Sequence, residues 1–131
     1  MPYVRISLLR GRSPAALAAL SEGVQRALVE AFDTPEGDCF QAIHQHAPGE
    51  LVFDRDYLGG PRSDDFVLVH VVAGRARPEA VKRAFYRRLA GQLAASPGIR
   101  PEDLMIVLST TEAADWSFGH GLATMLEGER P

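Results

Sequence analysis

Four residues of this 131-residue sequence carry groups that could bind a small carboxylate and react with it. Pro2 follows the initiator methionine, so removal of Met1 would leave a free secondary amine, a titratable group that no internal proline offers. Arg75 and Arg77 precede an expected helix, where two guanidiniums beside unpaired helix N–H groups suit an anion. Asp38 precedes an expected strand and could act as a general acid or base.

Each of these residues also has a purely structural interpretation. A proline is tolerated at the start of a strand, which is where Pro2 stands. An aspartate such as Asp38 commonly caps a turn, and both arginines could be solvated loop residues. Residue type and spacing alone leave the two interpretations open.

Aromatic and histidine side chains form a second group of candidates. Trp116 and Phe118 stand in a glycine-containing stretch near the carboxyl end, where they could form an apolar wall for a small ligand or lock the end of the core. His44 and His46 share one face of an expected strand, but a zinc site needs three or four ligands, and no cysteine or glutamate stands at a matching spacing. We therefore predict no metal site and expect His44 and His46 to be partly buried or in oligomer contacts. His70, in the middle of a strand, is expected to be a satisfied core or interface histidine.

Composition limits the class of protein. A net charge of −3 gives no electrostatic reason to expect a nucleic acid or an anionic membrane as partner. The single cysteine, Cys39, excludes an internal disulfide and suits a reducing compartment. No apolar run reaches the roughly 20 residues of a membrane span, and the alternating first segment, with Arg5 inside it, is not a signal peptide. We predict a cytoplasmic protein whose residues 1–131 form one domain.

The first half of the chain, residues 2–46, has the pattern of a strand–helix–strand unit. Ser13 and Pro14 are the residue types favoured at the N-cap and the first position of a helix. The apolar residues that follow recur every three or four positions, namely Leu17, Leu20, Val24, Leu28 and Phe32. The flanking strands are expected over residues 2–9 and 40–46.

The second half, residues 66–110, repeats this plan. A nearly continuous apolar, β-branched strand is expected over residues 66–73, and a second strand over residues 104–108. The apolar stripe of the helix between them consists of Val81, Phe85, Leu89 and Leu93. Corresponding turn segments of the halves are 63 to 66 residues apart, which indicates an internal two-fold repeat.

Two such units predict an α/β (α+β) fold, a tandem βαβ repeat whose four-stranded sheet carries two helices on one face. Residues 66–73 look buried on both faces, so the open face needs a partner, most simply other copies of the chain, and we predict an obligate oligomer. The connection between the halves, residues 47–65, is longer than a hairpin needs and is expected to form a surface excursion or an oligomer contact. Residues 111–131 are expected to form a carboxyl-terminal flap.

Together these features give the chain a family resemblance. It resembles the tautomerase superfamily and, within it, the malonate semialdehyde decarboxylase branch, nearly from end to end. The segments that carry the resemblance are MPYVRISLLRGRS at the start, the stretch that ends at Asp38, Gln45 to Glu50, Leu58-Gly59, Arg62-Ser63, the Arg75/Arg77 turn, and Asp115-Trp116-Ser117-Phe118-Gly119. The DWSFG stretch and the arginine turn are the more specific pieces.

The resemblance implies a homotrimer in which an amino-terminal proline is the catalytic group, with no metal or organic cofactor. It assigns that role to Pro2, once Met1 is removed, and makes Asp38 the acidic residue beside it. It makes Arg75 and Arg77 the residues that hold the substrate carboxylate.

The resemblance also assigns Trp116 and Phe118 to the aromatic wall of the substrate pocket. Met125 stands at a further wall position where the family pattern has an aromatic residue. His44 replaces a small polar residue, close to the expected pocket. The turn with both arginines is one residue longer than in the decarboxylase pattern, which leaves room for one guanidinium to point elsewhere.

The implied activity is cofactor-independent chemistry on small oxo acids, with malonate semialdehyde decarboxylation as the first expectation. A protonated Pro2 could hydrogen-bond the carbonyl oxygen and stabilise the enolate formed when carbon dioxide leaves. A neutral Pro2 could instead remove a proton α to a carbonyl, which gives a keto–enol tautomerase for phenylpyruvate-like 2-oxo acids. A third interpretation, from another class, is a non-catalytic trimeric binding protein on the same scaffold.

Overall fold

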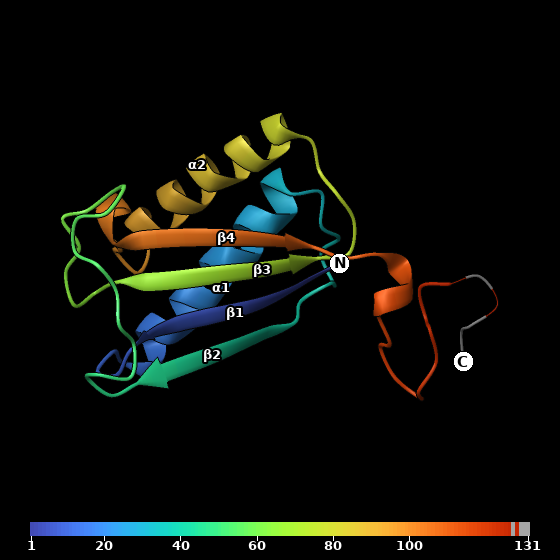
Figure 1. The fold of residues 1–131 in the computed structure, drawn as a ribbon, viewed down its shortest axis with the longest axis horizontal. Coiled ribbons are helices and arrows are strands. Elements are labelled where there is room, and N and C mark those ends of the chain that lie inside the picture. Colours follow the sequence, from blue (N-terminus) through green and yellow to red (C-terminus); the bar gives the residue numbers. More distant parts are fainter. Residues whose placement is uncertain (127, 129–131) are drawn as a thin grey trace.

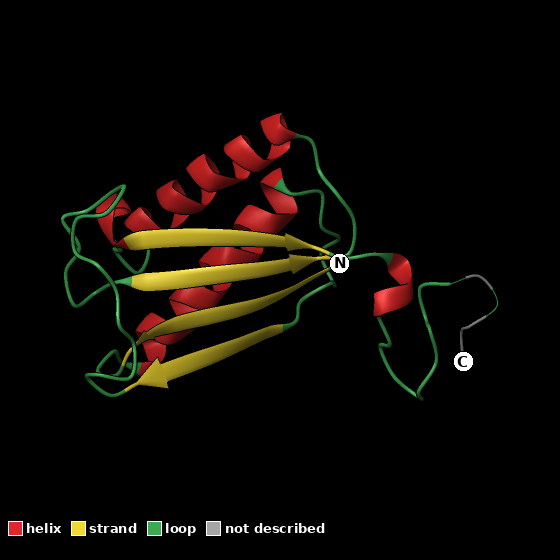
Figure 2. Cartoon of the chain, viewed as in Figure 1, coloured by secondary structure: helices red, strands yellow, loops and turns green. Residues whose placement is uncertain are grey.

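Four strands and two long helices are arranged in two layers in the computed structural model, which describes residues 1–126 and 128 (Figures 1 and 2). The strands are β1 (Pro2–Leu9), β2 (Gln41–His46), β3 (Val67–Ala73) and β4 (Leu104–Thr110). The helices are α1 (Pro14–Ala31) and α2 (Glu79–Ala95), and both lie on the same face of the sheet. This confirms the predicted α/β fold with two helices on one face.

The strand order pairs the first strands of the two halves, β1 and β3, in the middle of the sheet. The sheet runs β2-β1-β3-β4, with parallel pairing of β1 with β2 and of β3 with β4, and antiparallel pairing of β1 with β3. Pro2, the first residue of β1, therefore pairs with Ala73, the last residue of β3. The start of the chain, the end of β3 and the end of β4 meet at one end of the sheet (Figure 1).

Both helices bury one apolar stripe against the sheet. The Oγ of Ser13 accepts a hydrogen bond from the Ala16 N–H at 3.1 Å, and Pro14 begins α1, as the sequence predicts. The helices approach closely at Gly23, where a Cβ would lie 2.8 Å from the Leu93 Cδ2. Among the described residues, no helix has the length and apolar character needed to cross a membrane.

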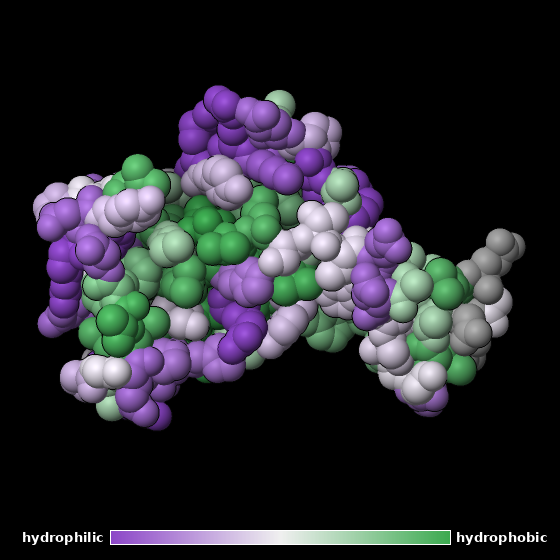
Figure 3. Space-filling model, in the orientation of Figure 1, coloured by the Kyte–Doolittle hydropathy of each residue, from purple (hydrophilic) through white to green (hydrophobic). Residues whose placement is uncertain are grey.

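The sheet face opposite the helices is partly apolar and uncovered in the single chain. Strand residues alternate between faces, so Val69 and Val71 are buried under the helices while Leu68 and Val72 are only half-buried on the other side. Met105 of β4 is also exposed there, and Figure 3 shows apolar side chains gathered over the middle of this face.

A buried carboxylate fastens the connection between the halves to the start of β4. Asp103 is fully buried, and its two oxygens accept hydrogen bonds from the Ser63 N–H at 2.6 Å, the Ser63 hydroxyl at 2.7 Å and the Arg100 Nε at 3.1 Å. Burial by itself would raise the pKa of Asp103, but these bonds from Ser63 and Arg100 hold it below its ordinary value.

We expect Asp103→Asn to lower the free energy of unfolding by about 1–3 kcal/mol at pH 7, because the amide replaces an acceptor-only carboxylate. A carboxyl pKa that is lower in the folded chain adds stability above its unfolded value of about 3.9, and this stability is lost as the pH falls through the folded pKa. The difference in free energy of unfolding between wild type and variant, measured by urea unfolding, should therefore become smaller in acid.

Asp64→Asn is the matched control for this experiment, because the Asp64 side chain is 81% exposed where it pairs with Arg55. It should change the free energy of unfolding by less than about 1 kcal/mol. An Asp103→Asn protein as stable as wild type at pH 7 would contradict the anchoring role.

Candidate active site

The amino terminus lies in a polar corner at the end of the sheet. The Met1 amine is 3.0 Å from the Asp38 Oδ2, and the Met1 carbonyl accepts a hydrogen bond from the Gly74 N–H at 2.9 Å. Gly74 leaves space for this contact, since a Cβ there would lie 2.7 Å from the Met1 Cε. The Pro2 nitrogen is three bonds from the Met1 amine and so lies within about 4 Å of it.

Asp38 is held by the segment between α1 and β2. Its N–H donates to the Pro35 carbonyl at 3.1 Å, and its own carbonyl accepts from the Gln25 side chain at 3.1 Å. Two residues later the Phe40 carbonyl accepts from the Val4 N–H at 3.0 Å, which fixes this segment beside β1. Asp38 is half-buried, so its carboxylate is accessible beside the amino terminus.

Arg75 and Arg77 lie on the loop after β3, next to the amino-terminal corner, but their guanidiniums face different partners. Arg77 is buried, donates from Nε and Nη2 to the Phe32 carbonyl at 3.2 and 3.0 Å, and stacks 4.2 Å from the Phe32 ring centroid. Its Nη1 donates to the Arg75 carbonyl at 3.0 Å. Arg75 is exposed and forms an ion pair with Asp33.

The surroundings of Arg77 shift its pKa. Burial, and then the neighbouring charge of Arg75, lowers the pKa of Arg77, while Asp33 and Asp38 offset part of this effect. A guanidinium has five N–H donors, and within the described chain three of those of Arg77 are engaged. Two of its five donors are therefore not engaged within the described residues.

The carboxyl-terminal segment is attached to this corner through Thr111, the residue after β4. The Trp116 Nε1 donates to the Thr111 Oγ1 at 2.6 Å, and Thr111 is bonded to the Ala73 carbonyl beside Pro2. Trp116 and Phe118 are stacked, with ring centroids 5.5 Å apart and planes inclined by 12°. The Phe118 ring centroid is also 5.5 Å from that of Phe40. Trp116, Phe118 and Phe40 therefore form a row of contacting rings that ends two residues after Asp38.

The remaining predicted residues are less closely tied to this corner. Met125 is half-buried in the turn after Thr124, whose hydroxyl accepts from the Phe118 N–H at 2.9 Å. His44 and His46 are half-buried on β2, as the sequence predicts, and the buried Nε2 of His44 has no hydrogen-bond partner among the described residues. The part of the flap at residues 127 and 129–131 lies outside the described residues.

His70 lies on the open sheet face, where its Nε2 is 2.7 Å from the Ser109 hydroxyl, so it is a satisfied histidine away from the amino terminus. Within residues 1–126 and 128, no three histidine, cysteine, aspartate or glutamate side chains gather in a way that could hold a metal ion.

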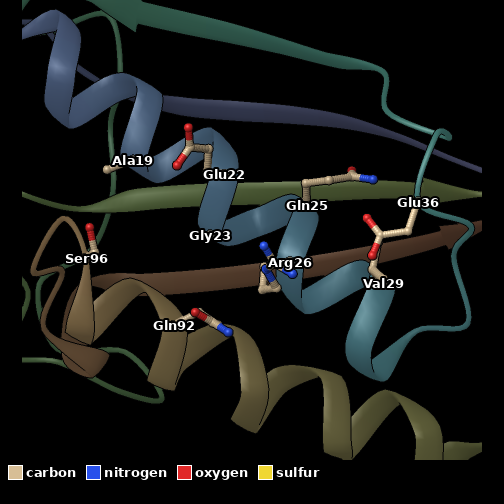
Figure 4. Close-up of a pocket in the computed structure, with 9 residues that line it drawn as sticks. All are labelled: Ala19, Glu22, Gly23, Gln25, Arg26, Val29, Glu36, Gln92 and Ser96. Atoms are coloured by element: carbon tan, nitrogen blue, oxygen red, sulfur yellow. The ribbon is translucent and has the colours of Figure 1, made fainter.

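A separate cleft of about 320 Å³ lies on the helix side, between α1 and α2 (Figure 4). Glu22, Gln25 and Arg26 of α1 and Gln92 of α2 are among the residues that line it. None of the residues selected from the sequence lines this cleft.

Sequence reasoning missed three residues of the corner. The sequence pattern predicts Phe40 only as the first residue of a strand, whereas β2 begins at Gln41 and the Phe40 ring packs against Phe118. Its position two residues after Asp38 is the one signal that could have identified it. Asp33, the partner of Arg75, and Thr111, which holds Trp116, have no local sequence pattern that distinguishes them from ordinary turn residues.

Comparison with known sequences connects this geometry to a family. Two family models, each described as tautomerase enzyme, match residues 38–119 and residues 2–60. The probable tautomerase YusQ of Bacillus subtilis (strain 168) is 37% identical over 127 residues, which cover 97% of this chain and 100% of that protein. The probable tautomerase YrdN of the same organism is 36% identical over 129 residues, 98% of this chain and 99% of that protein.

Solved structures agree with the sequence comparison. A malonate semialdehyde decarboxylase superposes with a TM-score of 0.90 at 39% identity, over 96% of this chain and 97% of that one. FG41 malonate semialdehyde decarboxylase, inhibited by 3-bromopropiolate, gives a TM-score of 0.86 at 31% identity, over 93% and 92% of the two chains. A fused 4-OT that forms a symmetric trimer gives 0.76 at 22% identity, over 97% and 99%, and shares the fold.

Proposed function

This chain belongs to the tautomerase family of enzymes, and we propose that it acts on small oxo acids as a decarboxylase of malonate semialdehyde. The observation that supports the proposal is that the amino terminus contacts Asp38 and Gly74, the residue before the Arg75/Arg77 loop. At the same end of the sheet, Trp116 is bonded through Thr111 to Ala73. The 39% identity to a malonate semialdehyde decarboxylase over nearly the whole chain supports this substrate.

In the proposed reaction, removal of Met1 exposes the ring amine of Pro2 beside Asp38. The protonated amine donates a hydrogen bond to the aldehyde oxygen of the substrate. The bond between the carboxylate carbon and the α-carbon breaks, carbon dioxide leaves, and the electron pair forms an enolate that this hydrogen bond stabilises. A proton taken up from the solvent is then transferred to the α-carbon and gives acetaldehyde. The reaction therefore consumes one proton for each carbon dioxide released and needs no cofactor.

The arginine loop is proposed to orient the substrate carboxylate. Arg75 is exposed and its partner Asp33 is 80% exposed, so an incoming carboxylate can replace that ion pair at little cost. Arg77 is held against Phe32 and supplies fixed positive charge from a buried position. The stacked rings of Trp116 and Phe118 would exclude water from the opposite side, which strengthens these charge interactions.

A keto–enol tautomerase for phenylpyruvate-like 2-oxo acids is the second candidate. The observation that favours it is that both Bacillus subtilis relatives, at 37% and 36% identity, are named as probable tautomerases. The same site would serve, with a neutral Pro2 moving a proton between the α-carbon and the enol oxygen.

Two assays at neutral pH distinguish these functions. Protein that begins at Pro2, verified by intact mass, is supplied either with malonate semialdehyde or with the enol of phenylpyruvate. We expect carbon dioxide and acetaldehyde from the first substrate at a rate far above any turnover of the second. Rapid enol conversion without release of carbon dioxide would overturn the decarboxylase proposal in favour of the tautomerase.

We propose further that the chain forms a homotrimer, located in the cytoplasm, in which the open sheet face is covered by other copies. An apolar cleft of about 480 Å³ adjoins this face, lined by residues of the connection and by Phe66, Leu68 and Met105. Val52 and Leu58 of the connection are 86% and 88% exposed. Large exposed side chains of this kind are typical of a protein interface.

Leu58→Asp should dissociate the homotrimer, because it places a charge in the buried contact. Leu58 has a φ of 48°, a left-handed conformation that aspartate adopts more readily than leucine, so the fold of the single chain should persist. Sedimentation should give three times the 14.3 kDa chain mass for wild type and a smaller species for the variant. Ala80→Asp, in the first turn of α2, is the control, and a trimeric Leu58→Asp protein would contradict the proposed contact.

A further inference from the structure

The hydroxyl of Thr111, just after β4, has a double role at the candidate site. It donates a hydrogen bond to the Ala73 carbonyl at 2.7 Å and accepts one from the Trp116 indole N–H at 2.6 Å. A hydroxyl has one proton and an indole N–H only donates, so the two bonds fix each other's direction. Trp116 is thereby tied to Ala73, the residue that pairs with Pro2.

The fold does not need this hydroxyl to satisfy the backbone. The Thr111 N–H already donates to the same Ala73 carbonyl at 2.8 Å, so that acceptor keeps a partner when the hydroxyl is removed. The bond that would be lost without replacement is the one from Trp116, whose side chain is half-buried.

The position of Trp116 decides where the aromatic wall lies. The segment after β4 extends away from the sheet in Figure 1, so its attachment near Thr111 sets its direction. Inside the segment, the Glu112 N–H donates to the Asp115 carboxylate at 2.8 Å, and the Asp115 N–H donates to the Glu112 carbonyl at 3.0 Å. These bonds hold residues 112–115 in one turn between Thr111 and Trp116. The bond from the Trp116 indole to the Thr111 hydroxyl can therefore set the orientation of this turn.

We propose that Thr111 is a positioning residue that holds the Trp116 indole, and through it Phe118, as the apolar wall beside Pro2. This inference rests on the proposed function, because the wall has a role only if a small oxo acid reacts at Pro2. Thr111 acts through Trp116 and does not touch the substrate.

Thr111→Val tests the proposal, because valine has the same shape and lacks the hydroxyl. We expect kcat/KM for malonate semialdehyde to fall about tenfold, mainly through a higher KM. Trp116 is the only tryptophan, so its fluorescence reports the lost bond directly, and the emission should shift in this variant. Thr111→Ser should restore both readouts, and Thr110→Val, at the exposed neighbouring position, should leave both unchanged.

A double-mutant cycle with Trp116→Phe keeps the test decisive if Thr111→Val is also less stable. If Thr111 acts through Trp116, the double variant should lose no more activity than the more impaired single variant. Fully additive losses, or an emission shift without any change in KM or kcat, would overturn the proposal. A wild-type protein inactive on both oxo acids, whose emission still shifts in Thr111→Val, would instead locate the failure in the proposed function.

Discussion

Pro2→Ala should lower kcat/KM for malonate semialdehyde by about 10²- to 10⁴-fold, the usual range for loss of a positioned proton donor. The variant keeps an amino group at the chain start but loses the ring that holds the nitrogen in one direction. The site should otherwise persist, because β1 is fixed by pairing with both β2 and β3. The assay is release of carbon dioxide, with circular dichroism and sedimentation to show that fold and assembly are intact.

Pro48→Ala is the matched control, since Pro48 is an exposed proline in the connection, away from the amino terminus. It should leave kcat/KM unchanged. A Pro2→Ala protein with wild-type kcat/KM would show that Pro2 takes no part in the chemistry. The reaction would then depend on other residues of the chain.

Arg77→Ala should lower both activity and stability, because its guanidinium has two roles. Its removal leaves the Phe32 carbonyl without two donors and removes a cation–π contact, for an expected loss of about 2–4 kcal/mol in the free energy of unfolding. It also removes buried positive charge beside Asp38. Urea unfolding and steady-state kinetics on the same preparations measure the two effects.

Arg75→Ala separates binding from stability. The Arg75 side chain is 54% exposed, so its removal should change the free energy of unfolding by less than about 1 kcal/mol while raising KM about 10- to 100-fold. Arg26→Ala, at an exposed arginine of α1, should change neither quantity. Equal and small effects of Arg75→Ala and Arg77→Ala on KM would contradict a carboxylate-binding loop.

Much of the fold follows from local patterns in the sequence. Ser13 and Pro14 predict the start of α1, and the apolar stripe that ends at Phe32 predicts the helix face that is buried. These features are determined by residues close in the sequence, through capping and helical periodicity. The repeat then predicts the second unit, and with it a four-stranded sheet.

The details of the candidate site depend on contacts between distant residues, which no local pattern encodes. The sequence places Arg75 and Arg77 together, but only the fold shows that Arg77 turns inward to Phe32 while Arg75 faces Asp33. No feature of the sequence around Thr111 distinguishes it from other residues that follow a strand, and its contact with Trp116 appears only in the folded chain. Such long-range pairings could be predicted only from a known relative.

The central claim is that the free ring nitrogen of Pro2 performs the chemistry, and the most direct test changes only that nitrogen. Two forms of the same chain, one that begins at Met1 and one that begins at Pro2, are prepared, verified by intact mass and assayed for carbon dioxide release from malonate semialdehyde. In the first form the nitrogen is part of an amide that neither donates nor accepts a proton, and the Met1 amine takes the place beside Asp38. We predict at least about 100-fold higher activity for the form that begins at Pro2, whereas equal activities would contradict the account.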